Sequence, residues 1–194
     1  MRKFIAIMLI TNIFICGSNA SWKIDFVRRD EDLSEIRKVF FHSFMSEFKN
    51  LTAEEMKLRW SPKEIWADNL FKIETDLWRM MPEKRWLLKA TDKNNHEILS
   101  TCLLSQDEED EKAIFGIILC VNPDFQRLGI GKSFGLFIAD NFPNHDTLKA
   151  ITGKFNQKAL NFYKKNGFKK SNVKHPSLET GAYVALERPL KAKL

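Results

Sequence analysis

Apolar and polar residues alternate over several short stretches of the chain, and this period of two is typical of strands with one buried face. The first such stretch is KIDFVRR, at residues 23–29. Three longer apolar runs, at residues 85–91, 97–105 and 113–121, are separated by polar turns and therefore predict an antiparallel meander. Shorter runs predict three further strands, at residues 148–152, 168–173 and 182–188.

Between these predicted strands, apolar residues recur at the spacing of a helix. One apolar stripe follows the acidic residues 30–32, which we expect to cap its helix, and consists of Leu33, Ile36, Phe40 and Phe44. A second helical region, 52–81, begins with a capping box at Thr52–Glu55. Its tryptophans pack in the core or line a substrate cleft; they are Trp60, Trp66 and Trp78.

Two more helices are predicted in the second half of the chain. One follows a glycine loop near residue 130, and the other spans Asn156–Asn166 and ends at Gly167 as a left-handed cap. The order of strands and helices predicts a mixed α/β fold with helices on both faces of the sheet. No linker divides residues 21–194, so we expect a single domain there.

The first twenty residues have a different pattern. Two basic residues precede an apolar run, Phe4–Ile15, and small residues follow up to Ala20. This arrangement is typical of a signal peptide, and the run is shorter than the roughly 20 residues that span a bilayer. Residues 1–20 therefore predict a secreted or exported protein without a stable membrane span. A cytoplasmic protein, or one held by an uncleaved N-terminal anchor, is the alternative.

Charge and cysteine content narrow the function classes. The formal net charge is +6, and residues 147–178 hold eight lysines without an acidic residue. That stretch has no arginine, so we expect a small anionic ligand rather than nucleic acid. The acidic run 107–111 is typical of a solvated turn, with attraction of a cationic amine as the alternative. The four histidines lack metal-ligand spacing, so no metal is expected. Cys102 and Cys120 each lie in an apolar run, and we expect them to be unreactive thiols in the core.

The stretch QRLGIGKS, residues 126–133, has the composition of a phosphate-binding loop. A Walker A loop would place a glycine at position 126, where Gln126 stands, and the dinucleotide fingerprint would place one at Phe134. Both nucleotide interpretations therefore fail. The two glycines still open a helix, and its free N–H groups and dipole favour an anion.

Two motifs carry a resemblance to a known family. VNPDFQRLGIG, at residues 121–131, resembles the acetyl-CoA motif of the GNAT N-acetyltransferase superfamily, and NQKALNFYKKNGF, at residues 156–168, resembles its second motif. The resemblance implies the GNAT-like acyl-CoA transferase fold, a mixed, largely antiparallel central sheet of about seven strands. It also implies a transferase that uses acetyl-CoA as co-substrate and an amine as acceptor.

The resemblance further implies roles for individual residues. Backbone groups of Leu119, Cys120 and Val121 would bind the pantetheine arm, and the amide of Cys120 or Val121 would polarise the thioester carbonyl. Asn156 would contact the pantetheine, and Tyr163 would be the general acid, although Tyr163 also suits an ordinary core face. The pyrophosphate would bind the amides of Gln126, Arg127, Leu128, Gly129, Ile130, Gly131 and Lys132.

The general base is where this sequence departs from the family pattern. Many members carry a glutamate in the strand before the loop, but AIFGIILCV at 113–121 has no carboxylate. A water molecule, a carboxylate or His175 from surrounding loops, or an acceptor that is already unprotonated would serve instead. Cys120 as a covalent nucleophile is a further alternative. The missing carboxylate also leaves open a catalytically silent module that binds acyl-CoA or a partner.

Overall fold

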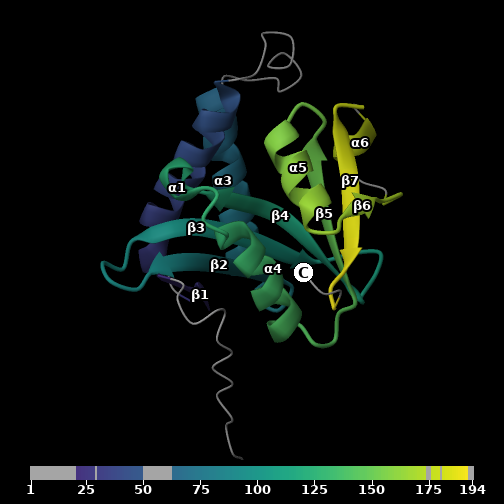
Figure 1. Cartoon of the computed structure of the whole chain (residues 1–194), viewed down its shortest axis with the longest axis horizontal. Helices are drawn as coiled ribbons and strands as arrows, with labels where there is room; N and C mark the ends of the chain where they lie inside the picture. The colour runs from purple at the N-terminus through teal and green to yellow at the C-terminus, as the bar shows by residue number, and fades with distance from the viewer. Residues whose placement is uncertain (1–20, 29, 50–62, 174–175, 180, 192–194) are drawn as a thin grey trace, which may run out of the picture.

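The computed structural model of the protein describes residues 21–28, 30–49, 63–173, 176–179 and 181–191. Its strands form one seven-stranded sheet in the order β1-β2-β3-β4-β5-β7-β6 (Figure 1). All neighbouring strands pair antiparallel except β4 and β5, which are parallel. The strands are β1 Trp22–Phe26, β2 Arg85–Asp92, β3 Ile98–Gln106, β4 Ala113–Val121, β5 Thr147–Gly153, β6 Lys169–Lys170 and β7 Tyr183–Pro189.

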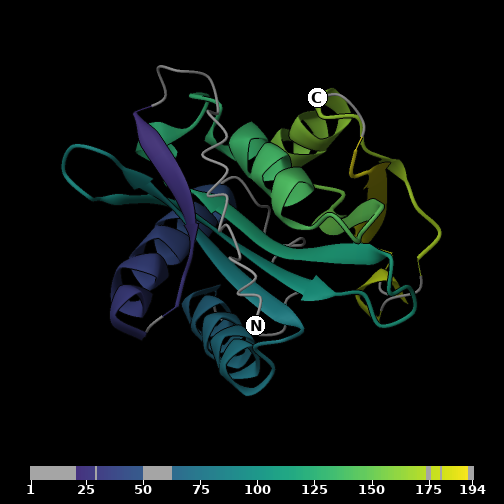
Figure 2. The same ribbon diagram turned by 90° about the horizontal axis from the view of Figure 1, so that it is seen from below.

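Helices cover both faces of this sheet. Figure 2 shows α1 (Leu33–Phe48) and α3 (Lys63–Met80) against one face, and α4 (Ile130–Asn141) with α5 (Gln157–Lys165) against the other. A short helix, α6 (Pro176–Glu179), precedes β7. The prediction of a mixed, largely antiparallel sheet of about seven strands with helices on both faces is confirmed.

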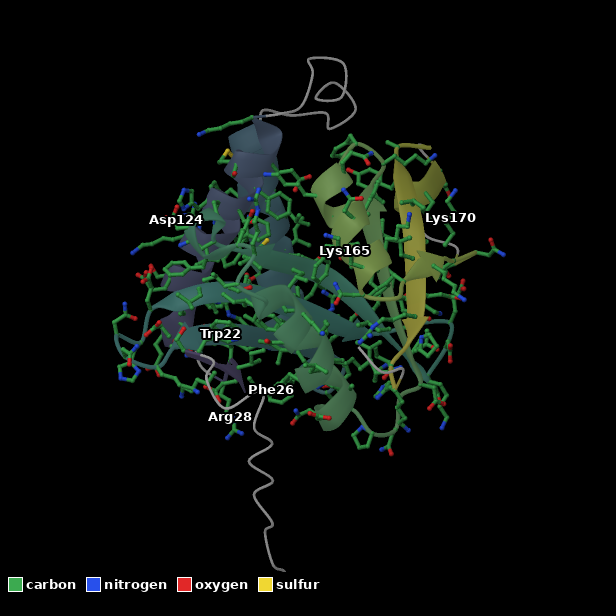
Figure 3. All side chains as sticks on the ribbon, in the orientation of Figure 1. Trp22, Phe26, Arg28, Asp124, Lys165 and Lys170 are labelled. Carbon is green, nitrogen blue, oxygen red and sulfur yellow. The ribbon has the colours of Figure 1, made fainter. Side chains whose placement is uncertain are left out.

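Each face of the sheet has its own apolar core. On the α1 side, Ile36 and Phe40 are almost completely buried and pack with Ile118 and Cys120 of β4. On the α4 side, Ile130, Phe134 and Ile138 pack with Leu99, Cys102 and Leu104 of β3 and with Leu148 of β5. The aromatic residues Trp22 and Phe26 of β1 lie beneath α4 in Figure 3, and the Phe26 ring centroid is 5.4 Å from that of Phe137. The sheet is thus sandwiched between two layers of helices.

Most predicted elements lie where the sequence pattern places them, with two exceptions. The last predicted strand pair is uneven, because β6 is only two residues long. Asp32 precedes α1 but makes no side-chain capping bond; its carboxylate accepts instead from Nζ of Lys89 at 2.6 Å. Trp78 packs against the α1-side core, as an ordinary helical face would. The predicted capping box and Trp60 lie outside the described residues, as does the side chain of Trp66.

The acidic turn between β3 and β4 is not simply a solvated tip. Asp107 is buried, and its carboxylate accepts from the backbone N–H groups of Glu109 and Asp110 at 3.0 and 2.9 Å. Nζ of Lys149 lies 3.2 Å from the same carboxylate, and the two side chains are only 11% and 5% exposed. Lys149 is therefore a structural cation that stabilises this turn.

The predicted signal peptide, residues 1–20, lies outside the described residues and stays a prediction. Within the described ranges, none of the helices has the length and apolar content needed to cross a membrane.

Candidate active site

Strand β4 has two halves with different pairing. Its first half, Ala113–Gly116, pairs in register with Thr147–Ala150 of β5 and is called the paired half here. Among the described residues, β5 offers no partner to β4 beyond Gly116, although β5 itself continues to Gly153 beside β7. Residues 117–121 form the open half of β4, and Figure 1 shows the two strands diverging there. The open half can thus accept a ligand as an additional strand.

Two hydrogen bonds show which backbone groups face this gap. The N–H of Asn122 donates to the carbonyl of Leu99 on β3 at 2.9 Å, and the carbonyl of Cys120 accepts from Oγ of Ser100 on β3 at 2.5 Å. Backbone groups of successive residues in a strand point to opposite edges. Asn122 and Cys120 therefore face β3, and the N–H and C=O groups of Leu119 and Val121 face the gap. Of the two amides predicted to polarise the thioester, the alternation favours Val121.

The loop after β4 brings N–H groups to the mouth of the gap. Asn122 begins a short 3₁₀ helix, Pro123–Phe125, and its Oδ1 accepts from the N–H of Asp124. Arg127 and Gly129 both have positive φ angles, +67° and +93°, so the chain turns sharply into α4. Helix α4 begins at Ile130 without a side-chain cap from Gly129, which leaves its first N–H groups directed out of the helix. Such a helix start favours an anion.

The predicted residues of this loop have unequal exposure. The side-chain amide of Gln126 donates to the carbonyl of Val121 at 3.2 Å, which joins the loop to the open half of β4. Leu128 is 54% exposed, whereas Ile130 is buried in the α4-side core, so only the backbone of Ile130 is available to a ligand. Lys132 follows in the first turn of the helix.

Helix α5 lies opposite this loop. Oδ1 of Asn156 accepts from the N–H of Ala159 at 2.9 Å and caps the helix. At the other end, Gly167 has a φ of +80° and the N–H of Phe168 bonds to the carbonyl of Tyr163, which confirms the predicted glycine cap. A Cβ atom on Gly131 would approach the Phe162 ring to 3.0 Å, so glycine permits the close contact between α4 and α5.

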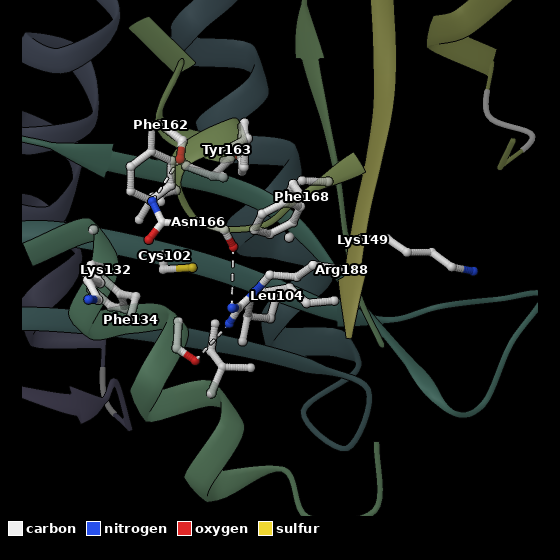
Figure 4. Close-up of a pocket in the computed structure, with 18 residues that line it drawn as sticks. Cys102, Leu104, Lys132, Phe134, Lys149, Phe162, Tyr163, Asn166, Phe168 and Arg188 are labelled. Carbon is white, nitrogen blue, oxygen red and sulfur yellow. Dashed lines mark hydrogen bonds between the residues drawn. The ribbon is translucent and has the colours of Figure 1, made fainter. Parts of the chain in front are cut away.

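An apolar hollow lies between β4, β5 and these two helices (Figure 4). Its wall includes four of the predicted site residues, namely Leu119, Gly131, Lys132 and Tyr163. The other predicted site residues, Cys120, Val121, Asn156 and residues 126–130, are not part of this wall. Beyond the point where β4 and β5 diverge, the hollow is also lined by Leu104, Leu148 and Arg188.

Tyr163 points from α5 into this hollow. Its ring lies 4.9 Å from that of Phe168 and 5.4 Å from that of Phe162, measured between centroids. Burial raises the pKa of its hydroxyl above the ordinary tyrosine value, and the negative charge of Glu47 acts in the same direction. The hydroxyl is therefore protonated at neutral pH and can donate a proton, as the prediction of a general acid requires.

Cys102 and Cys120 are free thiols, although they lie on neighbouring strands. Thr101 is the partner of Cys120 in the ladder, and the two cysteines belong to the cores on opposite faces of the sheet. Burial raises the pKa of Cys102 to about 12 and raises that of Cys120 further. A buried thiol with a raised pKa is a poor nucleophile, which disfavours covalent catalysis by Cys120.

Arg188 of β7 is a site residue that sequence analysis missed. It is 2% exposed, and burial lowers the pKa of its guanidinium. Its Nη atoms lie 3.5 Å from the carbonyls of Asn166 and Gly135, and Nε has no partner among the described residues. Figure 4 shows the guanidinium in the wall of the hollow. The strand sequence YVALERP did not indicate that this arginine is buried, because an exposed arginine would fit the same alternation of apolar and polar residues.

Sequence analysis also missed the contribution of α1 to this region. Helix α1 packs against Cys120 through Phe40. Besides burial, which raises the pKa of Cys120 and Tyr163, the Ser43 side chain lowers the pKa of Cys120 and the charge of Glu47 raises the pKa of both groups. His175, named from the sequence as a possible base, lies outside the described residues. The described residues contain no group of three or more histidine, cysteine or acidic side chains that could hold a metal ion.

Comparisons with known proteins agree with this geometry. The model of the GNAT acetyltransferase family matches residues 45–168. No curated protein matches the sequence. The fold is similar to that of the PaiA N-acetyltransferase of Thermoplasma acidophilum in complex with coenzyme A, with a TM-score of 0.65 and 18% identity over 86% of this chain and 99% of that one.

Two further solved structures have the same fold. The acetyltransferase of Thermus thermophilus gives a TM-score of 0.60 at 18% identity, covering 86% of this chain and 96% of that one. The ribosomal-protein-S18-alanine N-acetyltransferase of Escherichia coli gives a TM-score of 0.56 at 14% identity, covering 89% of this chain and 96% of that one. The family match spans both motifs and the open half of β4, and the chain therefore belongs to the GNAT family of acetyltransferases.

Proposed function

We propose that the protein transfers the acetyl group of acetyl-CoA to an amine by direct attack in a ternary complex. The observation that carries the proposal is the open half of β4, which shares a hollow with Tyr163 and leads into a loop and a helix start that suit an anion. Of the predicted loop amides, that of Gln126 already donates to the carbonyl of Pro123 at 3.3 Å. An acyl-CoA has the matching parts in the matching order: a pyrophosphate, an amide-rich pantetheine arm and a thioester.

The residues present fit coenzyme A. In the proposal, the backbone groups of Leu119 and Val121 bind the pantetheine amides as a neighbouring strand would. The amides of residues 126–132 hold the pyrophosphate, and Lys132 adds a positive charge at the same helix start. Asn156 uses Oδ1 to cap α5, so Nδ2 is the group that would donate to the pantetheine.

The chemistry requires one stabilised oxygen and one proton donor. The N–H of Val121 points into the gap and would donate to the thioester carbonyl oxygen as negative charge develops there. Tyr163 would protonate the departing thiolate. Its raised pKa keeps the proton on the hydroxyl over the working pH range, so the donor holds its proton before each turnover.

The test is a measurement of CoA thiol release with acetyl-CoA and a panel of amines that includes alkylamines, polyamines and peptides with free N-termini. We expect amine-dependent thiol release and an acetylated product identified by mass. Binding of coenzyme A without thiol release above background, across the whole panel, would indicate the alternative, a silent acyl-CoA-binding module.

We further propose that residues 1–20 export the protein as a cleaved signal peptide. The basic start, the apolar run and the small residues before position 21 support this. An exported enzyme would have to meet acetyl-CoA outside its own cytosol, for example inside another cell. Fusing residues 1–30 to a reporter that is active only outside the cytosol tests the export, and a silent reporter would contradict it.

A further inference from the structure

Helix α1 lies across the face of the sheet opposite to α4, next to the open half of β4. Its buried side begins with Ile36 and continues with Val39 and Phe40, which pack against Ile118 and Cys120. Residues three and four positions apart share one side of a helix. Ser43 and Glu47 therefore continue the same side of α1, one and two turns beyond Val39, towards the end of β4.

Packing places this part of α1 over the open half of β4. Val39, Phe40 and Phe44 of α1 belong to the same apolar core as Ile117, Ile118 and Cys120 of the open half. Burial raises the pKa of the Cys120 thiol, and the Ser43 side chain acts in the opposite direction, as a hydrogen-bond donor beside the thiol would. Glu47 lies one turn further and is partly buried. Its negative charge raises the pKa of both Cys120 on β4 and Tyr163 on α5. The helix spacing and this packing put Glu47 on the side of α1 that faces the open half of β4, one turn beyond Ser43.

The gap thus has chemically different sides. The loop and the start of α4 provide N–H groups and Lys132, which suit an anionic donor, whereas α1 provides a carboxylate, which suits a cationic acceptor. The titratable groups on which the charge of Glu47 acts include Cys120 on β4 and Tyr163 on α5. Burial raises the pKa of both groups, so both are neutral at pH 7 and do not compete with Glu47 for the role of base.

We propose that Glu47 is the catalytic carboxylate that binds the acceptor amine and takes its proton. This inference rests on the proposed acetyl transfer and adds the side from which the acceptor enters, the α1 side of the sheet. It also supplies the base that the strand 113–121 lacks.

Every proton in the proposed step then has a donor and an acceptor. Glu47 first takes one proton from the bound ammonium group and releases it to water, which frees the lone pair of the nitrogen. The amine nitrogen then attacks the thioester carbon, and the second proton that the nitrogen loses passes to the Glu47 carboxylate. The carbon–sulfur bond breaks as the tetrahedral intermediate collapses, and the thiolate takes the proton of the Tyr163 hydroxyl. Proton exchange with water returns Glu47 to its ionised form and Tyr163 to its neutral form. The products are an N-acetylated amine and free coenzyme A.

The test compares Glu47→Gln with the matched control Glu35→Gln. Glu35 lies on the same helix, is 57% exposed and pairs with Lys38, outside the gap. For an alkylamine acceptor, we expect Glu47→Gln to lower kcat about 100-fold and to leave the Kd for coenzyme A and the Tm unchanged. Glu35→Gln should leave all three values unchanged, and Glu47→Asp should recover part of the lost rate.

A second readout separates proton transfer from a structural role. A hydrazine or an aromatic amine is already unprotonated at neutral pH and needs less help from a base. Glu47→Gln should therefore cost at least about tenfold less in kcat with such an acceptor than with an alkylamine. A purely structural defect would lower both rates equally, and this result overturns the proposal.

The outcomes distinguish this inference from the proposed function. Wild-type activity together with an unchanged kcat in Glu47→Gln would overturn the role of Glu47 alone. Absence of amine-dependent thiol release in the wild type would overturn both proposals together.

Discussion

The paired and open halves of β4 are alike in sequence and opposite in structure. Residues 113–116 are AIFG and residues 117–121 are IILCV, and neither segment has a charged side chain. The paired half has β3 on one edge and β5 on the other. The buried ion pair of Asp107 and Lys149 lies at the turn that precedes it. The open half has β3 on one edge and, on the other, the hollow that reaches Tyr163.

This contrast shows that backbone pairing, rather than side-chain chemistry, distinguishes the binding half of the strand from the structural half. Buried backbone groups need partners. The paired half obtains them from β5, and we propose that the open half obtains them from coenzyme A. The same strand then serves as scaffold at one end and as ligand-binding edge at the other.

The largest expected effect comes from removing the acid that faces the open half. Tyr163→Phe retains the ring contacts with Phe162 and Phe168 but removes the hydroxyl, so we expect kcat to fall about 100-fold or more. The Kd for coenzyme A should stay within about twofold. The measurement is thiol release under single-turnover conditions, and an unchanged rate there would remove Tyr163 from the chemistry.

A change beside the paired half should affect stability instead. Asp107→Ala removes the 3.2 Å partner of buried Lys149, leaves it with Asp110 at 3.8 Å, and frees two backbone N–H groups. We expect the free energy of unfolding, measured with urea, to fall by about 3 kcal/mol. Activity per folded molecule should be retained at 25 °C, because the turn lies at the far end of β4. A loss of activity without a loss of stability would show that the two halves are coupled.

A pair of glycines separates backbone strain from ligand binding. Gly129 and Gly181 both have positive φ angles, +93° and +68°, and a Cβ atom would meet no neighbour within 4 Å at either position. Alanine at each should cost about 1 kcal/mol of stability, since only glycine adopts this conformation without strain. Only Gly129→Ala should also weaken coenzyme A binding, which calorimetry would measure. Equal affinities in the two variants would show that the loop does not hold the ligand.

The smallest expected effect concerns the thiol beside the hollow. Burial raises the pKa of Cys102 to about 12, whereas an unfolded thiol titrates near 8.5. The stabilising contribution of the neutral thiol is therefore complete below the unfolded pKa and is lost as the pH rises towards the folded pKa. Between about pH 8 and about pH 9 the loss should be about 0.7 kcal/mol.

Comparing the pH dependence of unfolding in the wild type and in Cys102→Ala measures this contribution. The variant should lose about 0.7 kcal/mol less over the same interval. Identical slopes would mean that Cys102 is accessible to water in the folded protein.

Local sequence signals predicted the features that depend on neighbouring residues. Alternation and apolar runs predicted β2, β3 and β4 to within two residues at either end. They did so because a strand that is buried on one or both faces needs apolar residues at the buried positions. The C-terminal cap of α5 followed from Gly167, whose backbone role is local. Asn156 was predicted as part of the helix and is its N-terminal cap instead. The loop before α4 was predicted from the two glycines for the same reason.

Features that depend on distant residues were not predicted. Lys149 pairs with Asp107 only because β5 lies beside the turn that precedes β4, and neither segment signals this partner in its sequence. Ser43 and Glu47 look like ordinary polar positions of an amphipathic helix until α1 is placed over Cys120. Arg188 likewise looks ordinary in its strand, and its burial follows from the packing of α4 and α5 above β7.

Residue-by-residue amide hydrogen exchange on β4, with and without coenzyme A, tests the central claim most directly. In the free protein, the amides of Leu119 and Val121 should exchange at least about tenfold faster than that of Ile114, because they face the gap. Saturating coenzyme A should slow Leu119 and Val121 and leave Ile114 unchanged. Binding of coenzyme A without protection of either open-half amide would contradict the assignment of the open half as the ligand-binding edge.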